Sequence, residues 1–150
     1  MAIYFYKTRD KYGCLSNFSR HGFQLENKWW PTSEHYFQAK KFEGTEFEEA
    51  VRQCSTPTKA AALGRDRALP LRSDWENVKN DIMRKAVYEK FTQNEDIKKL
   101  LLETGEEILI EKSPIDSYWG CGKNGDSKNM LGVILMEIRG ALKKENQTSL

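Results

Sequence analysis

The part of the sequence after Pro31 is filled by a series of helix-start signals, and this series constrains the fold more than any other feature. Ser, Thr, Asp and Asn cap helix N-termini through their side-chain oxygens, a Glu three residues later adds a second cap, and Pro is favoured in the first turn. Glycines that follow such segments mark helix ends. The signals are Thr32, Thr45 with Glu48, Thr56 with Pro57, Ser73 with Glu76, and Asn94, and the stops are Gly44, Gly64 and Gly105.

These signals divide the chain into predicted helices. They predict helices over residues 32–42, 45–54, 56–64, 73–91 and 94–105. A sixth helix is expected from Met130 to about Leu142, because Leu131, Ile134, Leu135 and Ile138 recur at helical spacing.

Strand signals are fewer and shorter. Aromatic or alternating stretches predict strands near residues 3–6 and 22–30, with a turn at Asn27-Lys28, and another strand is predicted at 108–111. The chain has the length of one ordinary domain and contains no repeat or linker. We therefore expect one compact domain over residues 1–150, mainly α-helical and of α+β class, with a few short strands and a loose tail at 143–150.

The composition excludes several classes of protein. Charged residues make up 31% of the chain, hydrophobic residues 39%, and no apolar run approaches the ~20 residues that cross a bilayer. A net charge of +2 without a long basic run does not indicate a nucleic-acid binder. Three cysteines without CxxC spacing, with two histidines, argue against disulfides and a transition-metal site, which leaves organic side chains or a hard cation held by oxygens for the chemistry. We expect no metal and no cofactor. The N-terminal sequence lacks the pattern of a secretion signal, and we expect a cytoplasmic protein without membrane contact.

A line of polar side chains on the helix at 32–42 is the first candidate functional feature. At about 100° per residue, Glu34, Gln38 and Lys41 fall on one narrow line, with Phe37 and Phe42 on either side. If the line faces solvent, it is ordinary helix surface. Its aromatic borders favour a cavity instead, where an acid, an amide and a cation contact something polar. The first-turn position of Glu34 also favours its carboxylate form.

Lys79 is an anomaly on the apolar face of the helix at 73–91. On the helical wheel it falls between Ala86 and Met83, where a lysine extends its amine to solvent, pairs with a carboxylate, or sits in an apolar site with a lowered pKa. In the third state the lysine is a nucleophilic amine. The sequence leaves these three states open.

A glycine-rich segment at 113–132 precedes the last predicted helix. Asp116 and Trp119 supply a carboxylate and a flat stacking face, which suit a heterocycle attached to a sugar. Glycines such as Gly120 let backbone approach a ligand closely, and the helix that starts after Asn129 offers N–H groups to a phosphate.

Three arginines, Arg65, Arg67 and Arg72, lie in a proline-containing loop at 65–72. Arginine binds phosphate as a planar fork, so these residues indicate a phosphosugar site. They can equally pair with acidic residues of the chain itself.

Several motifs occur in a fixed order between about residues 4 and 139. They are YGCLSNF, WPTSEHYFQAKKF, LGRDR, LRSDWENVKNDIM, DSYWGCG and KNMLGVILMEIR. In these motifs the chain resembles the YbiA-like family, also called NADAR for its association with NAD and ADP-ribose. The resemblance covers nearly the whole chain and implies a mainly helical domain with a small sheet.

The resemblance also implies N-glycosidase activity. Family members hydrolyse phosphorylated ribosylamino-pyrimidine intermediates of riboflavin synthesis, and others remove ADP-ribose from guanine bases. It implies catalytic roles for Glu34 and Asp116 and a Schiff base between the sugar and a lysine, for which Lys41 and Lys79 both lie in matching motifs. Ala62 stands where some relatives have a basic residue, so a phosphate contact is absent there. The residues expected to bind substrate are Asn17, Gln38, Arg65, Arg67, Trp75, Trp119, Gly120 and Asn129.

Two chemical routes fit these residues. A neutral lysine can displace the base from C1′ of the opened sugar and release ribose by hydrolysis. Alternatively, the base departs through an oxocarbenium-like state, with one carboxylate stabilising the cation and another activating water. Only the first route requires a lysine. A third reading is a module that binds ADP-ribose or NAD without cleavage. The expected partner is a small phosphorylated N-riboside, with nucleic acid only as an ADP-ribosylated substrate.

Overall fold

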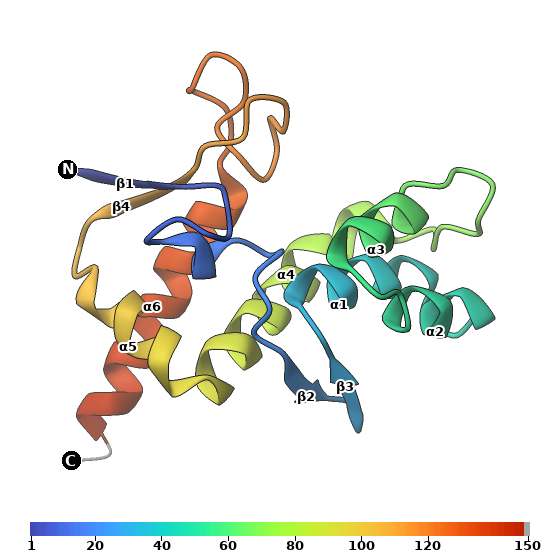
Figure 1. The fold of residues 1–150 in the computed structure, drawn as a ribbon, viewed down its shortest axis with the longest axis horizontal. Coiled ribbons are helices and arrows are strands. Elements are labelled where there is room, and N and C mark those ends of the chain that lie inside the picture. The colour runs from blue at the N-terminus through green and yellow to red at the C-terminus, as the bar shows by residue number, and fades with distance from the viewer. Residues whose placement is uncertain (149–150) are drawn as a thin grey trace. The chain divides into compact units, whose positions relative to one another are not determined.

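A computed structural model describes residues 1–148 of the chain (Figure 1). Contacts divide the chain into two compact units: residues 1–19 with the chain from Asn94 onward form the first, and residues 20–93 the second. Helices dominate and the strands are short, which confirms the predicted mainly α-helical, α+β class. With η denoting a 3₁₀ helix, the elements are β1 (Ala2–Phe5), η1 (Gly13–Leu15), β2 (Phe23–Leu25), β3 (Lys28–Trp30), α1 (Ser33–Ala39), η2 (Lys40–Phe42), α2 (Glu46–Arg52), α3 (Pro57–Gly64), α4 (Trp75–Gln93), α5 (Glu95–Glu103), β4 (Ile108–Glu111) and α6 (Met130–Thr148).

Helix α1 is the centre of the second unit. It packs against α2, α3, α4 and strand β3 (Figure 1), and every one of its residues is buried. Its polar side chains therefore lie inside the protein and need internal partners. The surrounding core consists of Phe23, Trp30, Tyr36, Ala39, Phe42, Val51, Ala60 and Ala86.

Local capping explains where three helices of this unit begin. In each, the side-chain oxygen of a threonine accepts a hydrogen bond from a main-chain N–H of the first turn, as predicted. The pairs are Thr32 with His35 at 3.1 Å, Thr45 with Phe47 at 3.2 Å, and Thr56 with Lys59 at 3.1 Å.

Two other predictions about these helices are wrong in detail. The capping box at Ser73 does not form: α4 begins at Trp75, and Glu76 pairs with Lys79 instead. The first predicted helix changes character before its end, because α1 stops at Ala39 and the next turn is the 3₁₀ helix η2.

The hairpin β2–β3 turns one residue earlier than predicted. Glu26 and Asn27 have φ angles of 58° and 64°, and two successive residues in this region are typical of a type I′ turn. The antiparallel pairing joins Phe23 to Trp30, so both large side chains lie on the buried face.

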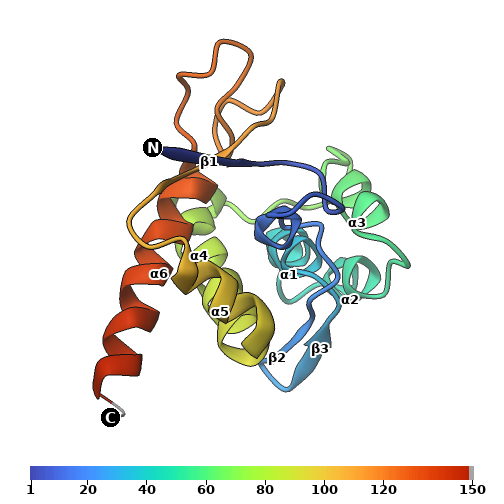
Figure 2. The same cartoon turned by 60° about the vertical axis from the view of Figure 1, so that its left-hand side comes forward.

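The first unit is built on a two-stranded parallel sheet. β1 pairs with β4 in a register that joins Ala2 to Ile108 and Phe5 to Glu111. α6 packs against β4 and α5, and α5 and α6 lie side by side (Figure 1 and Figure 2). The buried side chains of α6 are Leu131, Ile134, Leu135, Ile138, Arg139 and Leu142.

The last helix is longer than expected. α6 continues to Thr148, so the predicted loose tail at 143–150 is helical as far as residue 148, and its side chains there are exposed. The rest of that predicted tail, residues 149–150, lies outside the described residues.

Candidate active site

The polar line on α1 is buried. Glu34 is 7% exposed and Gln38 is 4% exposed, so the solvent-facing alternative is wrong. The Nε2 atom of Gln38 donates a hydrogen bond of 2.7 Å to Oε2 of Glu34. A carboxylate can only accept, and this fixes which end of the amide faces it. Gln38 therefore holds the Glu34 carboxylate in place from one turn further along the helix.

The other end of the Gln38 amide lies against Gly64 at the end of α3. Oε1 of Gln38 is buried without a hydrogen-bond partner among the described residues. A Cβ atom at Gly64 would lie 2.1 Å from this oxygen, far inside a normal contact. Only glycine therefore allows α3 to approach α1 this closely. The sequence indicated Gly64 only as a helix stop and gave no sign of this contact.

Lys41 is held at both ends by the segment that follows this glycine. Its Nζ donates to the carbonyl of Gly64 at 3.2 Å, and its own carbonyl accepts from the N–H of Arg72 at 3.0 Å. The amine also lies 5.9 Å from the ring centroid of Phe37 and 5.7 Å from that of Trp75. The two rings pack edge to face at 5.0 Å, so the amine borders an aromatic wall.

The surroundings of Lys41 favour its neutral form. Burial lowers the pKa of Lys41, the carboxylate of Glu34 opposes this shift, and the positive charges of Arg65 and Lys79 lower the pKa further. Among the described residues, no carboxylate lies in salt-bridge contact with the amine. Lys41 thus combines a partly buried amine, a lowered pKa and a nearby acid, the properties of a nucleophilic lysine.

Lys79 is in a different state. Its amine forms a 2.7 Å ion pair with Glu76 on the same helix, and Glu76 is exposed to solvent. Of the three states that the sequence left open, the structure shows the paired one. Because a paired ammonium is a poor nucleophile, Lys41 is the better candidate for covalent chemistry.

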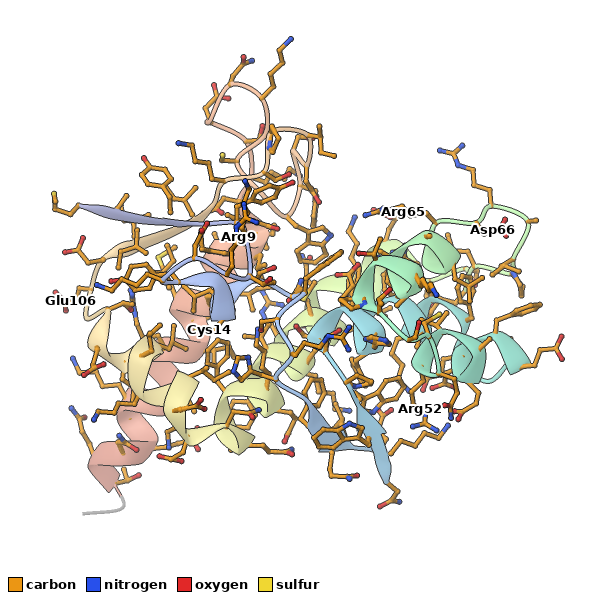
Figure 3. All side chains as sticks on the ribbon, in the orientation of Figure 1. Arg9, Cys14, Arg52, Arg65, Asp66 and Glu106 are labelled. Carbon is orange, nitrogen blue, oxygen red and sulfur yellow. The ribbon has the colours of Figure 1, made fainter. Side chains whose placement is uncertain are left out.

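The arginines after α3 divide into two kinds. Arg72 is fully engaged, with 2.6 Å to Asp74 and 2.8 Å to Glu43, and it anchors the loop. Arg65 and Arg67 are exposed and form no ion pair with another described residue. Figure 3 shows Arg65 at the end of α3, where its charge acts on Lys41. These two arginines are therefore available to a ligand.

In the first unit, Asp116 organises the loop before α6. Its Oδ1 accepts from the N–H groups of Tyr118 at 2.9 Å and Trp119 at 2.8 Å. The rings of these two residues pack edge to face at 4.8 Å. A Cβ at Gly120 would lie 2.8 Å from Cβ of Ser113, so glycine is needed for the close folding of this loop.

The predicted role of Asn129 needs correction. Its Oδ1 accepts from the N–H of Glu111 at 2.9 Å, and its Nδ2 donates to the carbonyl of Leu109 at 2.9 Å, so the side chain extends the edge of β4. The N–H groups of residues 129–131, at the start of α6, donate to the carbonyls of residues 118–120. They are occupied by the chain itself and do not offer a phosphate site.

The candidate residues fall into both units. Glu34, Gln38, Lys41, Trp75 and Lys79 lie in the second unit, as do Arg65 and Arg67. Asn17, buried in the segment after η1, lies in the first unit with Asp116, Trp119, Gly120 and Asn129. The union of the two groups in one site stays a prediction.

Residues 1–148 contain neither a cluster of potential metal ligands nor a membrane-spanning helix. No three His, Cys, Asp or Glu side chains in that range gather as a metal-binding group. No helix in that range is long and apolar enough to cross a membrane.

Comparisons with known proteins identify the family. A profile of the NADAR domain matches residues 4–143, which span both units. The chain is 49% identical to N-glycosidase Npun_R5314 of Nostoc punctiforme over 142 residues, covering 93% of this chain and 91% of that protein. It is similar to N-glycosidase YbiA of Escherichia coli, at 49% identity over 91% of this chain and 86% of YbiA. The NMR structure of Escherichia coli YbiA superimposes with a TM-score of 0.91, covering 98% of this chain and 88% of that one at 47% identity. A maize protein named riboflavin biosynthesis protein PYRR is 40% identical over 91% of this chain and 24% of its own length. The chain therefore belongs to the NADAR domain family.

Proposed function

We propose that the chain is an N-glycosidase that hydrolyses the N-glycosidic bond of a phosphorylated ribosylamino-pyrimidine of riboflavin synthesis, with Lys41 as the nucleophile. The names of the Nostoc and Escherichia coli relatives support the reaction class. The name of the maize relative supports a riboflavin intermediate as the substrate. The enzyme class is a hydrolase that acts on N-glycosyl bonds.

One observation carries the choice of nucleophile. The amine of Lys41 is bordered by the Phe37 and Trp75 rings and has a lowered pKa, while the alternative lysine is bound to Glu76. A lowered pKa increases the share of neutral amine, and the neutral amine is the form of lysine that attacks carbon.

The proposed reaction proceeds in two steps. The aminal opens so that C1′ of the sugar is an imine carbon, and the Lys41 nitrogen adds to it and displaces the aminopyrimidine. Glu34 accepts the proton that the attacking nitrogen loses and passes it to the leaving amine nitrogen. Water then adds to C1′ of the lysine imine, and the C–N bond breaks to give the free sugar aldehyde and Lys41 amine.

Other residues have supporting roles in this proposal. Gln38 keeps Glu34 oriented through its 2.7 Å hydrogen bond. Trp75 lines the wall beside the amine, and Arg65 and Arg67 bind the phosphate of the substrate as unpaired cations. Asp116 and Trp119 are proposed to hold the base, with Trp119 oriented by the turn that Asp116 caps.

Borohydride trapping tests the nucleophile. Wild-type protein, incubated with the ribosylamino-pyrimidine phosphate and sodium borohydride, should gain the mass of one reduced pentose phosphate, and peptide mapping should place it on Lys41. Lys41→Arg should lose the adduct and lower kcat by about a thousandfold or more. Lys79→Arg is the matched control and should keep both trapping and turnover within about tenfold of wild type.

The same experiment separates the competing functions. An adduct on Lys79, or normal turnover by Lys41→Arg, would overturn the assignment of Lys41. Tight binding without any turnover indicates a binding module. The two substrates are assayed side by side. If ADP-ribose is released from an ADP-ribosylated guanosine faster than the ribosylamino-pyrimidine phosphate is hydrolysed, guanine adducts are the substrate.

A cytoplasmic location is part of the proposal. All three cysteines, Cys14, Cys54 and Cys121, are free thiols. Free thiols fit a reducing compartment, in which disulfides do not persist.

A further inference from the structure

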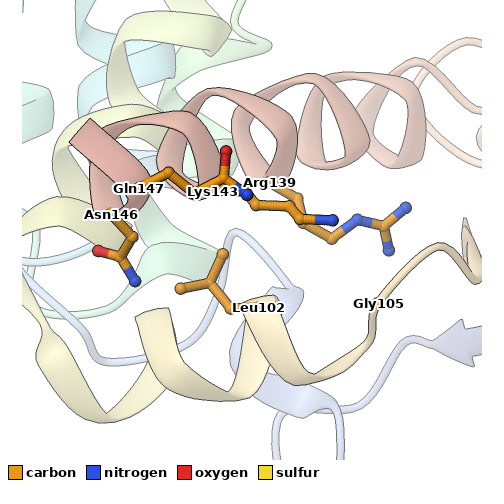
Figure 4. Close-up of a pocket in the computed structure, with 6 residues that line it drawn as sticks. All are labelled: Leu102, Gly105, Arg139, Lys143, Asn146 and Gln147. Atoms are coloured by element: carbon orange, nitrogen blue, oxygen red, sulfur yellow. The ribbon is translucent and has the colours of Figure 1, made fainter. Parts of the chain in front are cut away.

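A pocket in the first unit lies between the end of α5 and the last turns of α6 (Figure 4). Its volume is about 240 Å³. It shares no residue with the proposed N-glycosidase site. The residues that line it are Leu102, Gly105, Arg139, Lys143, Asn146 and Gln147.

Arg139 is the buried cation of this pocket. Its side chain belongs to a residue only 8% exposed, and one nitrogen, Nη1, makes both of its hydrogen bonds: 2.9 Å to Oγ1 of Thr104 and 2.8 Å to the carbonyl of Glu107. The other edge of the guanidinium, Nε with Nη2, donates to no described residue. Two parallel N–H groups on one edge form the fork that binds phosphate or carboxylate with two hydrogen bonds.

Lys143 places a second cation beside this fork. It lies one helical turn after Arg139, and in Figure 4 the two side chains extend in the same direction along the pocket. Within residues 1–148 Lys143 has no ion-pair partner. Glu107 accepts from Arg139 through its main-chain carbonyl only. Its carboxylate pairs instead with the amino group of Met1, at 3.6 Å.

A purely structural role accounts for only part of this arrangement. Arg139 ties α6 to the end of α5 through Thr104 and Glu107, and Nη1 alone does this. The unused fork and the neighbouring lysine leave two positive charges without a counter-charge in contact. Like charges at this helical spacing repel each other, and a bound anion would remove that repulsion.

We propose that this pocket binds a small phosphate monoester. A phosphate monoester carries close to two negative charges above pH ~6, which matches Arg139 and Lys143. The volume corresponds to about eight waters at ~30 Å³ each, enough for a phosphate with a small organic body. Leu102 supplies an apolar wall for that body, and Gln147 adds an amide to the lining.

The test titrates the full-length protein with glycerol 3-phosphate and follows backbone amides by NMR. Saturable shifts should appear at residues 102–105 and 139–147. Lys143→Gln should raise the Kd about tenfold or more, because it removes one charged hydrogen-bond donor. Lys144→Gln removes the same charge from the neighbouring exposed residue, which does not line the pocket, and should change the Kd by less than about twofold.

Several outcomes would overturn the proposal. Shifts confined to residues 20–93, or equal weakening by both variants, would show that the pocket is not the binding site. Equal affinity for 3-hydroxybutyrate, a carboxylate of similar size, would show that phosphate is not selected. Far-UV circular dichroism checks that both variants keep their helices, and because Lys143 is exposed we expect no loss of fold.

Discussion

The contact between Gln38 and Gly64 shows how much can depend on a single missing methyl group. A Cβ at Gly64 would meet Oε1 of Gln38 at 2.1 Å and the Cδ of the same side chain at 2.7 Å. The whole amide would have to move, and with it the hydrogen bond to Glu34. Gly64 thus sets the position of an acid that it does not touch.

Gly64→Ala should therefore lower stability and kcat together. Overpacking should reduce the free energy of unfolding by about 1–3 kcal/mol in a urea titration. On the proposed mechanism, kcat should fall at least about tenfold with less effect on KM, because the Glu34 carboxylate is displaced. The matched control is Gly140→Ala, where a Cβ meets nothing within 4 Å. That control should stabilise its helix by about 0.5–1 kcal/mol. Equal behaviour of the two variants would contradict the role of Gly64.

The sequence predicted the acid and the amide of this group but not the glycine. Glu34 and Gln38 could be found because they lie one turn apart within a single helix, and helical periodicity is readable from one segment. Gly64 lies in another helix, and its role depends on how α3 packs on α1. The lysine could not be chosen for a similar reason, since Lys41 and Lys79 differ in partners rather than in local pattern.

Among the elements, the Asn129 side chain joins β4 to the start of α6. It bonds to the main chain of Glu111 and Leu109 as a further strand residue would, and its φ of 50° lies in the left-handed region that Asn tolerates. Replacement by a residue without an amide leaves two main-chain groups without partners.

Asn129→Gly should separate the contribution of the two side-chain hydrogen bonds from that of the left-handed backbone conformation. It keeps the backbone conformation and removes both hydrogen bonds, and we expect a loss of about 1–3 kcal/mol in the free energy of unfolding. Hydrogen exchange should accelerate at the Glu111 amide, which loses its acceptor. Unchanged exchange at that amide would show that the side chain is dispensable.

Helix starts show which element boundaries can be predicted from nearby residues alone. The Thr32, Thr45 and Thr56 caps were predicted because a cap depends on residues within one turn. The predicted cap at Ser73 does not form. Arg72 binds Asp74 and also Glu43, and Glu43 lies 29 residues before Arg72 in the sequence. This long-range tie holds the chain before α4 and delays the helix to Trp75.

On the scale of the whole molecule, buried His35 links stability to pH. It is fully buried, its Nε2 lies 2.9 Å from the carbonyl of Cys54, and its Nδ1 lies 2.8 Å from the hydroxyl of Thr32. A carbonyl only accepts, so Nε2 carries the proton and Nδ1 accepts from the hydroxyl. Burial lowers the pKa of His35, the hydrogen bond to Cys54 partly opposes this, and Arg20 lowers it further.

Stability should therefore fall when the pH is lowered through the range below about 6.5. There the unfolded chain binds a proton on this histidine and the folded protein does not, so the slope is at most about 1.4 kcal/mol per pH unit. Above that range both states are neutral and the contribution is constant. Urea titrations at pH 7.5, 6.5 and 5.5 measure the free energy of unfolding across this range. His35→Gln should lose this part of the slope, and its loss in His21→Gln instead would contradict the assignment.

The fold class could be predicted from the sequence. Local sequence signals could not predict whether residues of the two units form one site. Capping and periodicity act within single elements, and they sufficed for a mainly helical chain with short strands. Glu34 lies in one compact unit and Asp116 in the other. Caps and periodicity carry no information on whether residues of two units share a site, and the NADAR motifs alone suggested that the two acids cooperate.

The loop before α6 is tied at its base by a ladder of main-chain bonds. The N–H groups of residues 127–131 donate to carbonyls of residues 117–121, and beyond this ladder the stretch 123–126 is exposed, with Gly125 at a φ of 77°. Length and composition can thus vary in this stretch while Asp116 and Trp119 keep their geometry. It is the natural place to insert an epitope or a fluorescent label without disturbing either residue.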